Sequence, residues 1–144
     1  MITAIAALVI GQSVVKTPGA TWHTDYNKAV AAAKKANRPI LINFTGSDWC
    51  GWCHRLEKEV FSQKEFGTYA KSNFVLLELD YPQFKKQAAS LKKQNEDIAV
   101  KYRVQNFPTV LVINAKGGIL AESGYQKGGA TAWINNLKAS LKKS

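Results

Sequence analysis

Residues 40–61 read ILINFTGSDWCGWCHRLEKEVF and contain both cysteines of the chain. The segment begins with the nearly continuous apolar run ILINF, which is typical of a strand that is buried on both faces. From Cys50 onward the pattern changes, because Cys53, Leu56 and Val60 recur at the spacing of one helix face. The two cysteines are therefore expected where a buried strand passes into a helix.

That position favours redox chemistry at the cysteine pair. A C-x-x-C pair can exchange a disulfide, hold half of a zinc site, or attach a haem with the adjacent His54 as a ligand. At the start of a helix, free backbone N–H groups and the helix dipole stabilise a thiolate. We expect Cys50 to be the nucleophile and Cys53, one turn later, to resolve the mixed disulfide. Gly51 and Trp52 would set the geometry between them.

The haem and zinc alternatives fit the rest of the chain less well. CGWCH (50–54) satisfies the haem-attachment pattern literally, but only Met1 or His23 is left as a second axial ligand. A closed structural zinc site needs four ligands. The donors on offer are Cys50, Cys53, His23 and His54, and their spacing fits no zinc finger. We expect no metal and no cofactor other than the redox-active Cys50–Cys53 dithiol.

The composition indicates one folded globular domain. The chain has 144 residues, of which 46% are apolar and 21% charged. Its formal net charge of +10 raises nucleic acid, anionic membranes and acidic proteins as partners. The lysines, however, fall as separated pairs along the chain, and no nucleic-acid-binding motif accompanies them. We expect a solvated basic surface and no nucleic-acid partner.

The N-terminal residues, MITAIAALVIGQSVV, have the apolar core of a secretory signal. Gly11 and Ser13 offer a small-x-small cleavage pattern, but no positive charge precedes the apolar run. We favour an export signal within residues 1–20, followed by one domain over residues 21–144. A first strand, or a true start further upstream, is the alternative, and without a signal the protein would be cytoplasmic.

The rest of the pattern predicts alternating helices and strands. The expected helices are 24–38, 50–61, 64–70, 82–103 and 131–143, and the expected strands are 39–46, 73–80, 107–114 and 118–123. Thr24 is the expected N-cap of the first helix. The turn AKGG (115–118) would join the last two strands as a hairpin. The order predicts an α/β fold with a mixed sheet of four or five strands between helices.

The motifs resemble the thioredoxin superfamily. DWCGWC (48–53), the strand before it and the later NFPT (106–109) match the family in order, over most of the chain. The stretch from Gly46 to Phe61 is most similar to exported thioredoxin-like reductases of bacterial envelopes and to small proteins described as disulfide isomerases. The former include the periplasmic C-terminal domain of the transmembrane disulfide reductase. The resemblance implies a thioredoxin fold with a cis-proline near the active site.

The resemblance also implies roles for individual residues. Pro108 matches the cis-proline, and Phe107 and Thr109 would form the substrate-docking edge with it. Trp49 matches the aromatic residue that covers the site. Glu57 matches an acidic residue that tunes the thiols or relays a proton, although a plain solvated carboxylate is the alternative.

Two departures from the family pattern stand out. Asn43 occupies the place where thioredoxins carry a buried aspartate that helps to deprotonate the second cysteine. Because asparagine cannot accept a proton, that task would fall to Glu57, Asp48 or water, or to no group at all. The segment DYPQFKKQAASLKKQNED (80–97) is longer than its thioredoxin counterpart. We expect a solvated decoration there, with recognition of a partner as the alternative.

The resemblance implies a periplasmic or otherwise exported thiol-disulfide oxidoreductase. Reduction of protein disulfides is favoured over isomerisation or oxidation. The partners would be proteins with disulfides or thiols and a membrane or soluble redox protein that reloads the dithiol, and we expect a monomer. A non-catalytic binding module is the remaining alternative, and the intact cysteines argue against it.

Overall fold

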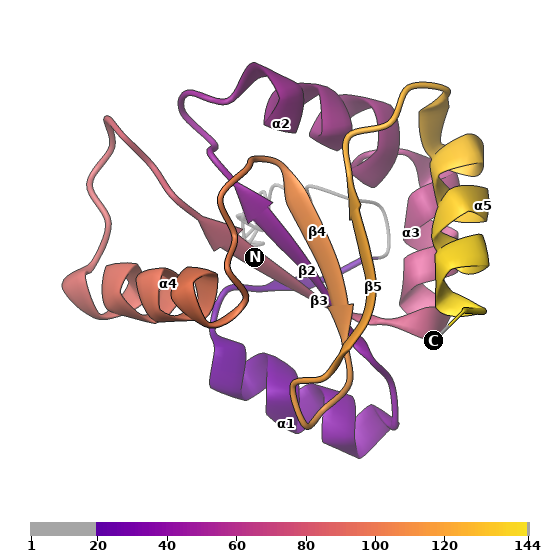
Figure 1. The fold of residues 1–144 in the computed structure, drawn as a ribbon, viewed down its shortest axis with the longest axis horizontal. Helices are drawn as coiled ribbons and strands as arrows, with labels where there is room; N and C mark the ends of the chain where they lie inside the picture. The colour runs from indigo at the N-terminus through magenta and orange to yellow at the C-terminus, as the bar shows by residue number, and fades with distance from the viewer. Residues whose placement is uncertain (1–19, 144) are drawn as a thin grey trace, which may run out of the picture.

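The computed structural model describes residues 20–143, which form a five-stranded sheet flanked by helices (Figure 1). The elements are β1 (Trp22–His23), α1 (Tyr26–Ala36), β2 (Ile40–Thr45), α2 (Gly51–Leu56), the π-helical turn η1 (Glu57–Phe61), α3 (Lys64–Asn73), β3 (Val75–Asp80), α4 (Ala89–Lys101), β4 (Thr109–Ile113), β5 (Ile119–Gly124) and α5 (Gly129–Leu141). The predicted mixed α/β sheet is confirmed. The export signal falls on residues outside the described range and stays a prediction.

The strand that leads to the cysteines is the central strand of the sheet. The strand order is β1-β3-β2-β4-β5, so β2 has a neighbour on each side. It runs parallel to β3 and antiparallel to β4, and all of its residues are buried. The nearly continuous apolar run in the sequence is thus explained, because both faces of β2 are covered.

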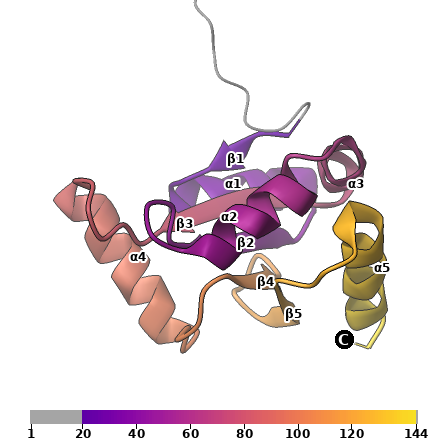
Figure 2. The ribbon, with the colours of Figure 1, turned by 90° about the horizontal axis from the view of Figure 1, so that it is seen from above.

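Alternate residues of β2 face two separate core clusters. Leu41 packs in a cluster with residues of α2, η1, α3 and α5, including Phe61 and Trp133. Ile40, Ile42 and Phe44 pack on the opposite face, with residues of α1 and α4. The helices α3 and α5 lie side by side on the first face (Figure 2). No helix in the described part of the chain is long and apolar enough to cross a bilayer.

Two details of the sequence prediction were wrong, and one short strand was not predicted. The N-cap of α1 is Asp25 and not Thr24, because the Asp25 carboxylate accepts the N–H of Lys28 at 3.0 Å. The helix expected from residue 82 begins at Ala89, because bonds described below hold the preceding stretch as a loop. The strand β1 was not predicted, since two residues are too few to show a periodic pattern.

Candidate active site

The cysteine pair lies at the expected junction of strand and helix. Cys50 is the N-cap of α2, five residues after the end of β2 at Thr45. A disulfide joins Cys50 and Cys53, whose Cα atoms are 5.2 Å apart. Both cysteines are buried, at 5% and 4% exposure. The N–H of Cys53 donates to Cys50 Sγ at 3.2 Å, and the same group would stabilise a Cys50 thiolate after reduction.

A tight turn delivers the chain from β2 to Cys50. The Gly46 carbonyl accepts the N–H groups of Trp49, at 3.3 Å, and of Cys50, at 2.9 Å. A Cβ on Gly46 would overlap the Trp49 indole, so glycine is what lets the indole fold back over the turn. From α2, His54 Nε2 donates to the Ser47 carbonyl at 2.7 Å. These contacts fix the backbone that precedes the nucleophile.

Trp49 connects this turn to the predicted docking edge. Its indole N–H donates to the Tyr81 carbonyl at 2.7 Å, and its ring lies edge-on to Phe107 with the centroids 5.7 Å apart. The Phe107–Pro108 peptide bond is cis, as the resemblance implied. Thr109 is buried, and its hydroxyl donates to a carbonyl of the same loop at 2.5 Å. The structure therefore brings Phe107, the residue before the cis-proline, beside Trp49, while the Thr109 hydroxyl bonds within its own loop.

A cluster of four side chains beside the disulfide was not predicted. Trp52, which lies between the cysteines, is 55% exposed, and its ring is 5.0 Å from that of Tyr125. The Arg55 guanidinium carbon lies 5.2 Å from the Trp52 ring and 5.1 Å from the Tyr125 ring. One Glu59 oxygen accepts from Arg55 Nε at 2.9 Å, and the other accepts the Tyr125 hydroxyl at 2.8 Å. Tyr125 follows Glu59 by 66 residues, so no local pattern reveals this pairing.

The charges in this cluster support one another. Hydrogen bonds from Tyr125 and Arg55 lower the pKa of Glu59, and the bond to Glu59 raises the pKa of Arg55. Glu59 is therefore a carboxylate and Arg55 a cation at neutral pH. The cation lies against the Trp52 ring, which is a cation–π arrangement. Trp52 is thus held by Arg55 of α2 and by Tyr125 of the loop after β5, and Glu59 of η1 bonds to both of these residues.

Asp48 anchors the long segment that the sequence singled out. Its Oδ1 accepts the N–H of Gln83 at 2.9 Å, and its Oδ2 accepts those of Phe84 and Lys85 at 2.9 and 2.8 Å. Desolvation acts to raise the pKa of Asp48, but the three amide bonds and the Lys85 charge together bring it below its ordinary value. An ionised carboxylate with these donors is a poor proton acceptor for the cysteines.

The neighbourhood of Asn43 contains a carboxylate that sequence reasoning missed. Asn43 is 4% exposed, and its Oδ1 has no hydrogen-bond partner within residues 20–143. It faces the same side of β2 as Leu41, whose core cluster includes Leu56 of α2. Glu78 of β3 lies opposite Asn43 in register and is half-buried. Glu57, which was predicted, is half-buried directly after α2.

The described residues do not assemble a metal site. Within residues 20–143, no three His, Cys, Asp or Glu side chains converge as metal ligands would. His23, which the zinc and haem alternatives need, lies in β1, and β3 separates that strand from β2. His54 is bonded to the Ser47 carbonyl. The geometry at the helix start suits thiol chemistry.

Comparison with known proteins agrees with this geometry. The disulfide bond reductase DsbH of Chlamydia pneumoniae is 33% identical over 121 residues, which cover 84% of this chain and 72% of that protein. The thioredoxin-related protein DsbJ of the same organism is 32% identical over 93 residues, or 65% of this chain and 27% of DsbJ. A solved structure of a DsbH oxidoreductase has a TM-score of 0.82 and 28% identity, over 97% of this chain and 96% of that chain.

A family model also matches most of the chain. The model describes a thioredoxin-like domain and covers residues 26–138, from the start of α1 into α5. That range contains the cysteine pair, the cis-proline and four of the five strands. The resemblance inferred from the motifs is thus confirmed, and this chain belongs to the thioredoxin-like domain family.

Proposed function

We propose that this protein reduces disulfides in other proteins through the Cys50–Cys53 pair. One observation carries the proposal: the Cys53 N–H points at Cys50 Sγ at the start of α2, directly after Trp49, which contacts Phe107 of the cis peptide. This arrangement favours a thiolate at the first sulfur and keeps the second sulfur within bonding reach. No electron carrier other than the dithiol is part of the proposal.

The reaction proceeds by two thiol–disulfide exchanges. The Cys50 thiolate attacks one sulfur of the substrate disulfide, forms a mixed disulfide, and releases the other substrate sulfur as a thiolate. Cys53 then loses its proton and attacks Cys50 Sγ, which releases the second substrate thiolate. Two electrons pass to the substrate, and the Cys50–Cys53 disulfide remains. A membrane or soluble redox protein must return those electrons for the next cycle.

The direction of electron flow is inferred from a relative. DsbH, which is described as a disulfide bond reductase, is 33% identical to this chain. We therefore favour reduction over isomerisation and oxidation. The test is the equilibrium reduction potential of the pair, titrated against dithiothreitol and glutathione. A potential near that of thioredoxin, about −270 mV, supports reduction, whereas a potential above about −180 mV contradicts it.

Several neighbours are proposed to support the reaction. Trp49, Trp52 and Phe107 would contact the substrate chain, and the cis-Pro108 loop with Thr109 would align it. Gly51 would set the geometry between the cysteines together with Trp52, and a Cβ at this position would meet nothing within 4 Å.

Glu57 is proposed to relay the Cys53 proton. A Glu57→Gln variant should slow release of the second substrate thiolate and flatten the pH profile of that step, while a Glu65→Gln variant on α3 should change neither. Rapid-quench analysis of a mixed disulfide at several pH values measures the step. An unchanged profile in Glu57→Gln would assign the proton to water or to Glu78.

The cellular setting follows from the same resemblance. We propose an exported, periplasmic protein that acts as a monomer on protein substrates. Fractionation of cells that express the full chain tests the location, and sedimentation tests the oligomeric state. A Cys50→Ser variant of an enzyme should lose reductase activity. A non-catalytic binding module would keep all of its function after the same substitution.

A further inference from the structure

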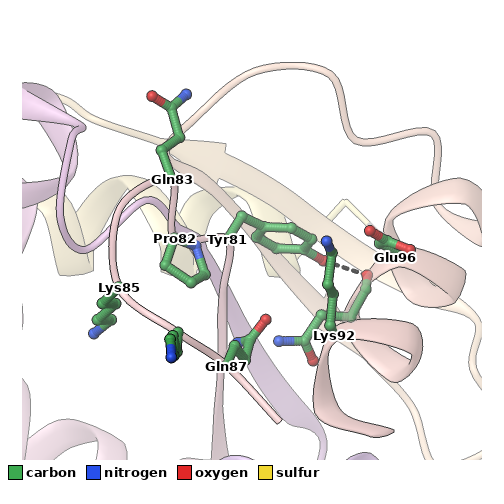
Figure 3. A pocket seen from close by; sticks show the side chains of 9 residues that line it. Tyr81, Pro82, Gln83, Lys85, Gln87, Lys92 and Glu96 are labelled. Carbon is green, nitrogen blue, oxygen red and sulfur yellow. Dashed lines mark hydrogen bonds between the residues drawn. The ribbon is translucent and has the colours of Figure 1, made fainter. Parts of the chain in front are cut away.

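A pocket of about 460 Å³ is lined by the loop that follows β3 and by α4 (Figure 3). One side is the segment from Tyr81 to Gln87, and the other is the first half of α4, with Lys92 and Glu96. Because three lysines line it, we call it the basic pocket. The sequence pattern did not predict a pocket, since the segment was expected to be a solvated decoration, with recognition of a partner as the alternative.

The wall of the basic pocket is bonded to the residues that precede the nucleophile. Asp48 accepts the N–H groups of Gln83 and Lys85, and the Trp49 indole donates to the Tyr81 carbonyl. Asp48 and Trp49 are the two residues before Cys50. A molecule seated in the pocket would therefore touch the segment that is bonded to the two residues before Cys50.

The pocket is held open by its own hydrogen bonds. The Tyr81 hydroxyl donates to the Asn95 carbonyl at 2.6 Å, and Asn95 Nδ2 donates to the Asp80 carbonyl at 3.0 Å. Gln87 Nε2 donates to the same carbonyl at 3.1 Å. A preformed wall lowers the entropy that a partner must lose on binding.

Two of the three lysines are available to a partner. Lys85 is paired with Asp80 at 3.2 Å. Lys86 and Lys92 are exposed and have no ion-pair partner within residues 20–143. The one acidic residue of the lining, Glu96, is exposed and also acts on Lys93, whose pKa it helps to raise after the larger effect of Asp97.

The segment from Tyr81 to Gln87 also carries an exposed aromatic side chain. Phe84 is 79% exposed, although its backbone N–H is fixed by Asp48. An exposed apolar ring on the same segment as Lys86 suits a protein segment better than a small anion. It is also more typical of an interaction site than of a solvated loop.

We propose that the basic pocket binds an acidic segment of the substrate protein while the disulfide of that protein reacts at Cys50. This inference rests on the proposed reductase function and adds a substrate class to it. Carboxylates of the segment would lie between Lys86 and Lys92, and an apolar side chain would contact Phe84. Substrates with acidic residues beside the reactive disulfide would then be reduced faster, mainly through KM and the association rate.

The test compares two peptides of equal length, each with one disulfide flanked by two glutamates or by two glutamines. The full chain is reduced, freed of reductant, and assayed on both peptides and on hydroxyethyl disulfide, a neutral small substrate. We expect kcat/KM to favour the acidic peptide by about five-fold at low salt, and the preference to fall as salt screens the charges. The Lys86→Glu/Lys92→Glu variant should lose the preference and keep its rate on hydroxyethyl disulfide.

A matched control separates the pocket from net charge. Lys142→Glu/Lys143→Glu changes the charge equally at the C-terminal end, which lies away from α4 (Figure 1). This control should keep the preference. An equal loss in both variants, or an unchanged preference in the pocket variant, would overturn the inference, as would equal rates on both peptides. Failure to reduce any disulfide would instead overturn the reductase function and this inference with it.

Discussion

Two glycines near the cysteines differ in what their missing side chain allows. A Cβ on Gly46 would overlap the Trp49 indole, which is held by the Tyr81 carbonyl and by Phe107. A Cβ on Gly51 would meet nothing within 4 Å. Only the first glycine is therefore required by space, although the second lies inside the C-x-x-C motif.

This difference predicts that alanine at the two positions changes the free energy of unfolding by different amounts. Gly46→Ala should lower the free energy of unfolding by about 1–3 kcal/mol, because the indole must leave its contacts. Gly51→Ala should change it by less than about 0.5 kcal/mol, because the site is open and alanine suits a helix start. Urea unfolding of the oxidised variants measures both values. If Gly46→Ala lost as little stability as Gly51→Ala is expected to lose, Trp49 would move aside at no cost.

The buried amide of Asn43 makes a second residue-scale prediction. Because its Oδ1 has no partner within the described residues, Asn43→Leu should change stability by less than about 1 kcal/mol. Asn43→Asp should cost about 1–3 kcal/mol at pH 7, because an ionised carboxylate would be buried opposite Glu78.

The pH dependence of Asn43→Asp has a definite sign. Burial raises the folded-state pKa of the new carboxyl above its unfolded value of about 3.9. The loss of stability should therefore be absent below that value, grow as the pH rises toward the folded pKa, and stay constant above it. Urea unfolding between pH 4 and 8 measures it. A large loss in Asn43→Leu would instead indicate a bound water at the amide.

At the scale of elements, contacts distant in sequence hold the active site in place. The cluster of Trp52, Arg55, Glu59 and Tyr125 joins α2 and η1 to the loop after β5. Asp48 joins the turn after β2 to the loop before α4. The helix that carries the cysteines is thereby held through the turn that precedes it and through its own side chains Trp52 and Arg55.

Tyr125→Phe tests the first of these connections. The change removes the hydroxyl that bonds to Glu59 and keeps the ring against Trp52, so the pKa of Glu59 should rise toward its ordinary value. The lowered pKa stabilises the fold above the unfolded pKa of Glu59, and this contribution is lost as the pH falls through the folded pKa. The variant should therefore be less stable than the parent at neutral pH and converge with it in acid.

Carboxyl NMR titration of Glu59 measures this shift directly. Tyr69→Phe is the matched control, because its ring lies on α3 and Lys138 contacts it from α5. The Glu59 pKa should stay unchanged in that control. An unchanged pKa in Tyr125→Phe would mean that Arg55 alone determines the ionisation of Glu59.

The same elements show how far the sequence could predict the structure. The strand before Cys50 and the helix after it were predictable, because burial on both faces and a single buried helix face leave distinct patterns. The cis-Pro108 loop was predictable only from the resemblance. The loop before α4 was not, because its shape depends on amide bonds to Asp48, more than thirty residues away. Contacts such as that of Tyr125 with Glu59 depend on the folded arrangement of the elements.

At the scale of the whole molecule, the redox state and the stability of the fold are linked. Both cysteines of the chain take part in the one disulfide. A reducing dithiol is one whose disulfide form is the more stable, whereas a strong oxidant has a stabilised reduced form. The direction proposed for the reaction therefore predicts which redox form is harder to unfold, and this can be measured without a substrate.

The oxidised protein should have the higher melting temperature. A difference of about 1–3 kcal/mol would correspond to about 3–12 °C for a domain of this size. Calorimetry with and without dithiothreitol measures it, and a Cys50→Ser/Cys53→Ser variant should melt at the same temperature in both buffers. A higher melting temperature for the reduced protein would contradict the reductase direction.

The way in which Asp48 holds its loop also bears on how this protein can change over evolution or be re-engineered. The carboxylate bonds to main-chain N–H groups at positions 83–85, and every amino acid except proline supplies such a group. The side chains at these positions are therefore free to vary while the anchor persists. New loops with other charges or shapes could be grafted beside an unaltered Trp-Cys-Gly-Trp-Cys core, so substrate preference can diverge without any cost to the chemistry.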